Sequence, residues 1–141
     1  PNHFELDYLP GRTTTTVAEV LAAAEALRAT GPDVVLVTST VLDSVDPDEI
    51  LMLVDTAEGA WQVTTPRLER NFTGSGDLTA ALFLAHYLEG DHAGEAMGRT
   101  ADVVYSLLKA TTEAGSAELL LVQAQDQLVQ PDHHFTVERL R

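Results

Sequence analysis

The spacing of apolar residues in the first third of the chain predicts one helix and one strand. Between positions 17 and 27 they recur at intervals of three and four residues, on one face of a helix: Val17, Val20, Leu21, Ala24 and Leu27. Thr16-Val17-Ala18-Glu19 fits a capping box at the start of this helix, and Gly31-Pro32 ends the pattern. The apolar run from Val34 to Val37 does not alternate, which is typical of a central strand covered on both faces in a parallel sheet.

The middle of the chain predicts a β-hairpin followed by a buried helix. Two extended stretches, 50–54 and 61–65, are joined by Thr56-Ala57-Glu58-Gly59, a sequence that suits a tight turn. After Gly76, residues 78–85 are apolar around nearly the whole circumference of a helix. A helix with this pattern is expected to be buried rather than packed by one face.

Two more helices are expected in the last third. Residues 93–112 place Met97, Ala101, Val104 and Leu108 on one face, and a further helix is expected between Gly115-Ser116 and Pro131. With an extended N-terminal segment, the order is strand, helix, strand, hairpin and three helices. This order indicates an α/β fold, and the small number of strands resembles the second half of a layered one.

Length and composition narrow the possible functions. A chain of 141 residues predicts one domain over 1–141. The formal net charge of −14 and the scattered basic residues argue against a nucleic acid partner. The absence of cysteine, of an apolar span and of a signal sequence favours a cytoplasmic protein without membrane contact. Because the chain begins with Pro1 and a motif begins at Asn2, we expect a fragment whose missing part lies upstream.

The strongest candidate for chemistry is Gly74-Ser75-Gly76-Asp77, which lies between extended chain and the predicted buried helix. Backbone N–H groups converge at a helix N-terminus, where the helix dipole also favours an anion. Glycines at such a turn allow a phosphate to approach the backbone closely. The simpler interpretation of these four residues is a glycine turn with Asp77 as the helix N-cap.

Four segments in order resemble ribokinase-like kinases, and the pyridoxal kinase branch in particular. They are Asn71-Phe72-Thr73-Gly74-Ser75-Gly76-Asp77, Asn2-His3-Phe4-Glu5, Val35-Leu36-Val37-Thr38-Ser39 and Thr65-Pro66-Arg67-Leu68. The resemblance covers essentially the whole chain. It implies the C-terminal, nucleotide-binding half of a ribokinase-like layered fold, with parallel central strands, a β-hairpin and flanking helices. The substrate pocket and its lid are expected in the missing N-terminal half.

The resemblance also implies a reaction and residue roles. Asp77 would take the proton from the 5′-hydroxymethyl group of pyridoxal while ATP donates its γ-phosphoryl group, which gives pyridoxal 5′-phosphate in vitamin B6 salvage. Asn2 and Glu5 would hold Mg²⁺ through water. The full-length enzyme is expected to be a homodimer, and this fragment to be inactive alone. The residues expected to contact ATP or its phosphates are Gly74, Ser75, Gly76, Thr38, Ser39, Thr65, Pro66, Arg67, Leu68 and Glu5.

Departures and alternatives remain open at this stage. Hydroxymethylpyrimidine kinases carry Cys where Asp77 stands, which favours the pyridoxal branch. Some bacterial pyridoxal kinases have Lys at the position of Thr38, so Arg67 or a monovalent cation such as K⁺ would supply the positive charge. Taken alone, Asn2 and Glu5 fit a solvated terminal strand, and Thr38-Ser39 a plain strand end. The rival functions are a kinase for another hydroxymethyl compound, a pyrimidine or a sugar, and an inactive fragment that self-associates.

Three histidines are weaker candidates. His133-His134 suggests a metal pair, but neighbours in an extended segment point to opposite faces and no third ligand has suitable spacing. A surface pair is the better interpretation. His86 is expected to be a core residue of its helix, and Phe72 to border the adenine.

Overall fold

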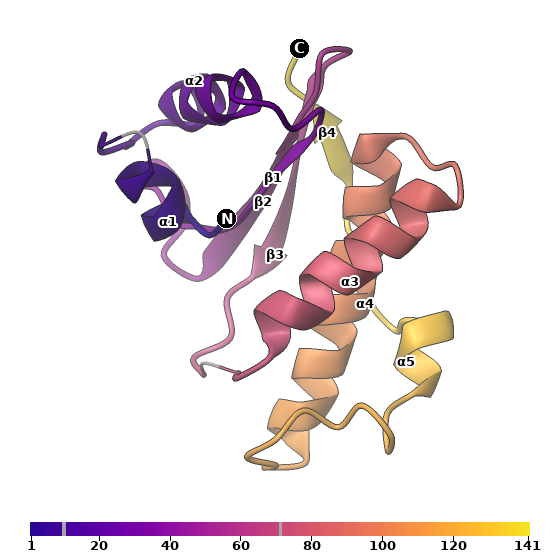
Figure 1. Cartoon of the computed structure of the whole chain (residues 1–141). Helices are drawn as coiled ribbons and strands as arrows, with labels where there is room; N and C mark the ends of the chain where they lie inside the picture. Colours follow the sequence, from indigo (N-terminus) through magenta and orange to yellow (C-terminus); the bar gives the residue numbers. More distant parts are fainter. Residues whose placement is uncertain (10, 71) are drawn as a thin grey trace. The chain divides into compact units, whose positions relative to one another are not determined.

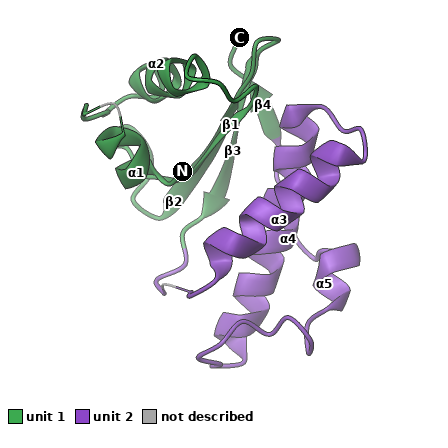
Figure 2. Cartoon of the chain, viewed as in Figure 1, with its two compact units in different colours: residues 1–67, 137–141 green, residues 68–136 purple. Residues whose placement is uncertain are grey.

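A computed structural model describes residues 1–9, 11–70 and 72–141, and within it the chain divides into two compact units (Figure 2). Unit 1 comprises Pro1–Arg67 and Val137–Arg141, and unit 2 comprises Leu68–Thr136. The last residues of the chain thus return to the first unit. The expectation of one domain over 1–141 stays a prediction.

Unit 1 is a sheet with helices (Figure 1). Its elements are α1 (His3–Tyr8), α2 (Val17–Arg28), β1 (Val35–Thr40), β2 (Glu49–Asp55), β3 (Ala60–Pro66) and β4 (Val137–Arg139). The predicted capping box starts α2, because the Thr16 side chain accepts from the backbone of Glu19 and the Glu19 side chain from that of Thr16. The predicted hairpin is formed by β2 and β3, and its turn is closed by a hydrogen bond of 2.9 Å from the Thr56 N–H to the Gly59 carbonyl.

The sheet has the order β1-β2-β3-β4, and every neighbouring pair is antiparallel. Parallel pairing was expected for the strand that became β1. Among the described residues, β1 makes parallel pairing only in one bridge, between Thr38 and Asn2. In β1, Val35 and Val37 are buried whereas Leu36 and Thr38 are only partly buried, so the expected cover on both faces is not complete. An apolar run also does not determine which way a neighbouring strand runs.

Helices α1 and α2 lie on the same side of the sheet (Figure 1). The core that they enclose with it consists of Leu6, Val20, Ala23, Ala24, Val35, Val37, Leu42, Leu51 and Leu53. Burying one leucine side chain in such a core contributes about 2 kcal/mol to the free energy of folding. The predicted apolar stripe of α2 faces this core, because Val20 and Ala24 belong to it and Val17, Leu21 and Leu27 pack against it.

The N-terminal segment is a helix, not the strand end that we expected. The Asn2 side chain accepts a hydrogen bond from the Glu5 N–H at 2.8 Å, and the Glu5 carboxylate accepts one from the Asn2 N–H at 2.8 Å. These reciprocal bonds form a capping box that starts α1. The same pattern of a capping residue followed three positions later by Glu had correctly predicted α2 and would have predicted α1.

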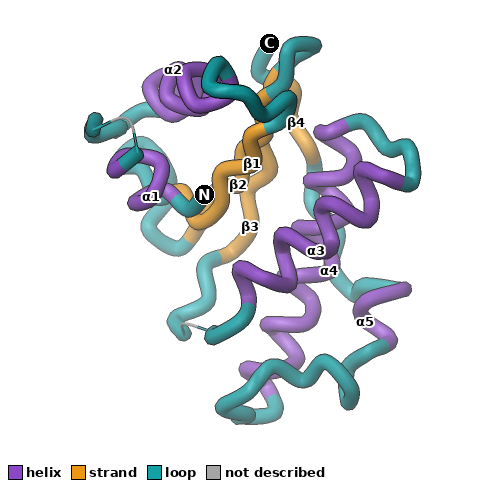
Figure 3. The backbone as a smooth tube through the Cα atoms, in the orientation of Figure 1, coloured by secondary structure: helices purple, strands orange, loops and turns teal. Residues whose placement is uncertain are grey.

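Unit 2 contains α3 (Ser75–Leu88), α4 (Ala93–Glu113) and α5 (Asp126–Val129); a short connection, 89–92, joins α3 to α4, and a longer loop, 114–125, joins α4 to α5 (Figure 3). Helix α4 matches the prediction. The helix expected between 116 and 130 is wrong for most of its length, since turns occupy 121–125 and α5 has only four residues. Burial of α3 was also expected, yet only Thr79 and His86 are buried, while Leu84 and Leu88 are 55% and 74% exposed.

The fold class is therefore confirmed at the level of an α/β half with a hairpin and flanking helices. The structure differs from the expected elements in four ways: α1 replaces a strand end, β4 was not foreseen, α5 is much shorter than the expected last helix, and the sheet is antiparallel.

Candidate active site

The start of α3 leaves backbone donors free. Gly74 is the N-cap, and its φ of 87° lies in the left-handed region that favours glycine. Gly74 has no side chain that could cap this end of the helix. Among the described residues, no protein oxygen accepts a hydrogen bond from the backbone N–H of Gly76 or Asp77. A Cβ at Gly76 would meet nothing within 4 Å, so the backbone there is open to an incoming group. These are the properties of an anion site at a helix N-terminus.

Asp77 is exposed and lies in the first turn of α3. It is the third residue of the helix, so the interpretation of Asp77 as the N-cap is wrong. Its carboxylate makes no hydrogen bond within the part of the chain that the structure describes, and it therefore keeps its lone pairs for a proton. The hydroxyl of Ser75, by contrast, donates to the Phe72 carbonyl at 2.8 Å.

In unit 1, the end of β1 carries an irregularity at the predicted phosphate contacts. The pairing of β1 with β2 shifts between Val37 and Thr40, and Ser39 within that bulge has a φ of 54°. Left-handed backbone at a residue other than glycine is uncommon, and such bulges re-aim side chains at functional sites. Ser39 is exposed, while Thr40 is fully buried with no hydrogen-bond partner for its hydroxyl among the described residues.

The sheet register brings a second predicted segment to the same edge. Thr40 pairs with Leu51 of β2, and Leu51 pairs with Thr64 of β3. The end of β1 and the end of β3 therefore lie about 10 Å apart, two strand spacings across the sheet. Thr65 and Pro66 close β3, and the N–H of Arg67 donates to the Asp48 carbonyl at 2.6 Å.

Asn2 and Glu5 lie beside this edge, because Asn2 bridges to Thr38 and the Thr38 N–H donates to the Pro1 carbonyl at 2.9 Å. One oxygen of each side chain is occupied by the capping box. The side chain of Asn2 has no second oxygen, whereas Glu5 is exposed and has a second carboxylate oxygen that fits contact with Mg²⁺ through water. Among the described residues, no three His, Asp or Glu side chains gather into a direct metal site.

The predicted residues thus form two groups. Unit 1 holds Asn2, Glu5, Thr38, Ser39, Thr65, Pro66 and Arg67, and unit 2 holds Leu68, Gly74, Ser75, Gly76 and Asp77. Asn71, the first residue of the kinase-like motif, lies outside the described residues. Sequence reasoning missed Arg70, which contacts both Phe72 and the loop after α4. No spacing rule could have found this contact, because Arg70 and Ser116 are far apart in the chain.

The histidines have structural surroundings. His134 Nδ1 donates a hydrogen bond of 2.8 Å to the Asp102 carboxylate, and the His134 side chain is largely exposed. The His133 ring packs edge-on against Tyr105. His86 is buried, as expected, and neither of its ring nitrogens has a hydrogen-bond partner among the described residues. Burial, followed by the positive charge of Arg99, lowers the pKa of His86 below its ordinary value of 6.5.

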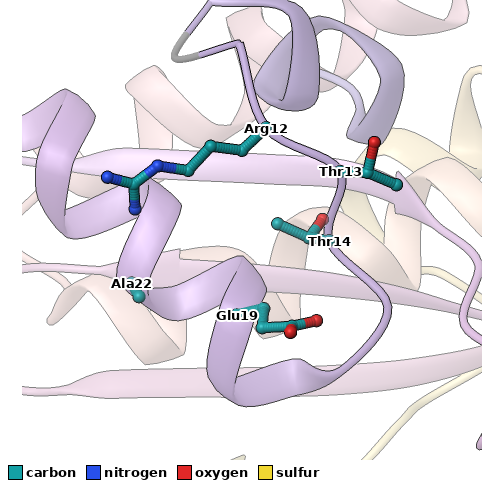
Figure 4. A pocket seen from close by; sticks show the side chains of 5 residues that line it. All are labelled: Arg12, Thr13, Thr14, Glu19 and Ala22. Carbon is teal, nitrogen blue, oxygen red and sulfur yellow. The ribbon is translucent and has the colours of Figure 1, made fainter.

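A separate hollow of about 400 Å³ lies at the start of α2 (Figure 4). Arg12, Thr13, Thr14, Glu19 and Ala22 line it, and none of them is a predicted site residue. Hydrogen bonds from the Thr15 backbone and hydroxyl lower the pKa of Glu19. Its carboxylate thus accepts the hydrogen bonds that cap α2.

Comparison with known proteins assigns the chain to a family. The sequence pattern of the phosphomethylpyrimidine kinase family matches residues 1–121. The chain belongs to this family. It is 46% identical over 140 residues to pyridoxal kinase PdxY of Leifsonia xyli subsp. xyli, and 47% identical over 141 residues to that of Rubrobacter xylanophilus. These alignments cover 99% of this chain and 50% and 49% of the two relatives, so the chain spans about half their length.

Solved structures of this family share the fold. Pyridoxal kinase from Leishmania donovani in complex with ADP and pyridoxine superposes with a TM-score of 0.88 at 27% identity, over 100% of this chain and 50% of that one. Pyridoxal kinase from Entamoeba histolytica gives a TM-score of 0.84 at 26% identity, over 99% of this chain and 50% of that one. The chain therefore has the architecture of about half a ribokinase-like kinase. No helix in the described ranges combines the length and apolarity that crossing a membrane requires.

Proposed function

We propose that this chain is the nucleotide-binding and catalytic part of an ATP-dependent pyridoxal kinase. The observation that carries the proposal is the start of α3, where the N–H groups of Gly76 and Asp77 have no acceptor among the residues that the structure describes and the Asp77 carboxylate is exposed. A helix N-terminus with free donors suits a phosphoryl group that gains charge, and a nearby carboxylate suits a general base. The relatives at 46% and 47% identity are pyridoxal kinases.

In the proposed reaction, Asp77 accepts the proton of the 5′-hydroxymethyl group of pyridoxal. The hydroxymethyl oxygen forms a bond to the γ-phosphorus of ATP, the bond from that phosphorus to the β,γ-bridging oxygen breaks, and ADP leaves with the electron pair. The N–H groups of Gly76 and Asp77 stabilise the equatorial oxygens of the transferred group. We assign Gly74 and Ser75 to shaping this turn.

The residues of unit 1 and Leu68 complete the proposal. Thr38 and Ser39 would bind phosphate oxygens, and the segment Thr65–Leu68 would contact the nucleotide. Asn2 and Glu5 would hold Mg²⁺ through water, which would neutralise phosphate charge. The proposal includes K⁺ or Arg67 as a further positive charge, a homodimeric full-length enzyme and a cytoplasmic location. The family resemblance supports the positive charge, and the homodimer and the cytoplasmic location are part of the same proposal.

Two measurements test the proposal. The first is titration of the 141-residue chain with Mg-ADP, where saturable binding is expected. The second is ATP-dependent formation of pyridoxal 5′-phosphate by a completed enzyme, in which the chain is joined to the part of the Leifsonia xyli relative that the alignment leaves uncovered. Higher kcat/KM for a hydroxymethylpyrimidine or a sugar than for pyridoxal would replace the proposed substrate. If the chain alone matched the completed enzyme, the proposed division of the site would be wrong.

A pyrimidine is the second candidate substrate, because the family that matches residues 1–121 is described as phosphomethylpyrimidine kinase. Asp77 favours pyridoxal, since the resemblance places Cys at this position in hydroxymethylpyrimidine kinases. The inactive, self-associating fragment is tested by the size of the chain in solution and by the same titration.

A further inference from the structure

Arg70 makes two contacts that join distant parts of unit 2. Its Nη2 donates a hydrogen bond of 2.9 Å to the Ser116 carbonyl, and its guanidinium carbon lies 5.4 Å from the centre of the Phe72 ring. Phe72 lies two positions before Gly74, the first residue of the glycine turn of α3. Ser116 belongs to the loop that follows α4, here called the post-α4 loop and defined as residues 115–121. Arg70 thus connects the approach to the proposed phosphate site with a loop 46 residues away.

The post-α4 loop has its own internal bonds and reaches the glycine turn. The Ser116 hydroxyl donates to the Glu118 carbonyl at 2.7 Å, and the Leu120 N–H donates to the Thr111 hydroxyl at 3.3 Å. These bonds hold Leu119 beside the turn, because a Cβ added to Gly74 would lie 3.8 Å from the Leu119 side chain. The post-α4 loop therefore lies against the glycine turn through Leu119 and contacts Arg70 through Ser116.

We propose that Arg70 is a positioning residue for nucleotide binding. By holding Phe72 with its guanidinium face and Ser116 with its edge, it fixes the post-α4 loop against the glycine turn. The turn then presents the N–H groups of Gly76 and Asp77 in one geometry before the nucleotide arrives, which reduces the ordering that binding requires. This inference rests on the proposed function.

The geometry requires arginine rather than any cation. A planar guanidinium can stack on a ring and donate from its edge at the same time, whereas a lysine ammonium is a point charge on a flexible chain. Arg70→Lys keeps the charge and removes the double contact. If Arg70 acted by its charge alone, as a direct phosphate ligand, Lys would replace it.

The test compares the wild-type chain with Arg70→Lys, Arg70→Gln, Leu119→Ala and the double variant Arg70→Gln/Leu119→Ala. Lys109→Gln is the control, because it removes one partly exposed positive charge of unit 2, whose ion-pair partner within the described ranges is Glu113. The readouts are the Kd for Mg-ADP and amide hydrogen exchange in 115–121. In the completed enzyme, KM for ATP and KM for pyridoxal are measured separately.

Both Arg70 variants are expected to raise the Kd for Mg-ADP and the KM for ATP by about threefold to tenfold, the range of one lost hydrogen bond. KM for pyridoxal stays unchanged, exchange in 115–121 becomes faster, and Arg70→Gln and Leu119→Ala are not additive. Wild-type affinity in Arg70→Lys overturns the inference and leaves the proposed function standing. Absence of Mg-ADP binding by the wild-type chain overturns both.

Discussion

Asp55 offers the sharpest test of how unit 1 is held together. Its carboxylate, 1% exposed at the end of β2, accepts a hydrogen bond of 3.0 Å from Arg28 Nε of α2 and another from Arg141 Nη2 at the end of the chain. One side chain therefore ties a helix, the sheet and the C-terminal residue together. Asp55→Asn keeps the size of the side chain, removes its charge and turns an NH₂ group toward one of two donors.

The expected loss in the free energy of unfolding of Asp55→Asn follows from the burial of the Asp55 carboxylate. Breaking a buried ion pair by removing one partner destabilises a protein by about 3–5 kcal/mol. The Arg28 and Arg141 side chains are 22% and 42% exposed and regain water when Asp55 is lost. We therefore expect the lower end, about 3 kcal/mol in the free energy of unfolding. For a chain of this length, that corresponds to a fall in Tm of roughly 10 °C.

The assay is urea unfolding of the 141-residue chain, followed by circular dichroism, with the midpoint and the slope m compared. Asp43→Asn is the matched control, because Asp43 is exposed, and its free energy of unfolding should stay within about 0.5 kcal/mol of wild type. Arg28→Ala and Arg141→Ala should each cost less than Asp55→Asn, since one donor remains. A loss below about 1 kcal/mol in the free energy of unfolding of Asp55→Asn would refute the reasoning. Replacing a desolvated carboxylate that accepts from two donors is expected to cost more than that.

Three further changes have definite expected outcomes. Asp77→Asn in the completed enzyme should lower kcat about 10²–10⁴-fold and leave the Kd for Mg-ADP within about threefold, with the exposed Asp126→Asn as control; near-normal turnover contradicts a base at this position. Because the pKa of His86 is lowered when folded, its contribution to stability is present above pH 6.5 and is lost as the pH falls through the folded pKa. The urea midpoint should therefore fall on acidification, and less so in His86→Gln; equal slopes in both proteins would count against this. In Gly59→Ala, the new Cβ would lie 2.8 Å from the Arg141 carbonyl oxygen, so a loss of about 1–3 kcal/mol is expected in the same unfolding assay, and none if the C-terminal residues moved away freely.

The sequence predicted elements whose signals are local. The capping box and apolar stripe of α2, the β2-β3 hairpin and α4 are each specified by residues within one element, and each is present. The same local rule predicts α1, whereas the family resemblance places Asn2 and Glu5 at a strand end, which is wrong. The glycine turn at Gly74 was correctly placed, since a left-handed residue before an apolar helix has few other sequence solutions.

Pairing and cover, by contrast, depended on tertiary structure. Periodicity records how many faces of an element are apolar, but it carries no information on the direction of a neighbouring strand or on whether a neighbour is present. The run at Val35–Val37 therefore became part of an antiparallel pair, and α3, apolar on most sides, has only Thr79 and His86 buried. The bulge at Ser39 depends on strand register. The pairing of β4 with β3 and the contact of Arg70 with Ser116 each join residues that are distant in sequence. Local sequence determined the start of α3 and the place of Asp77, while the long-range contacts that position them were decided only by the folded chain.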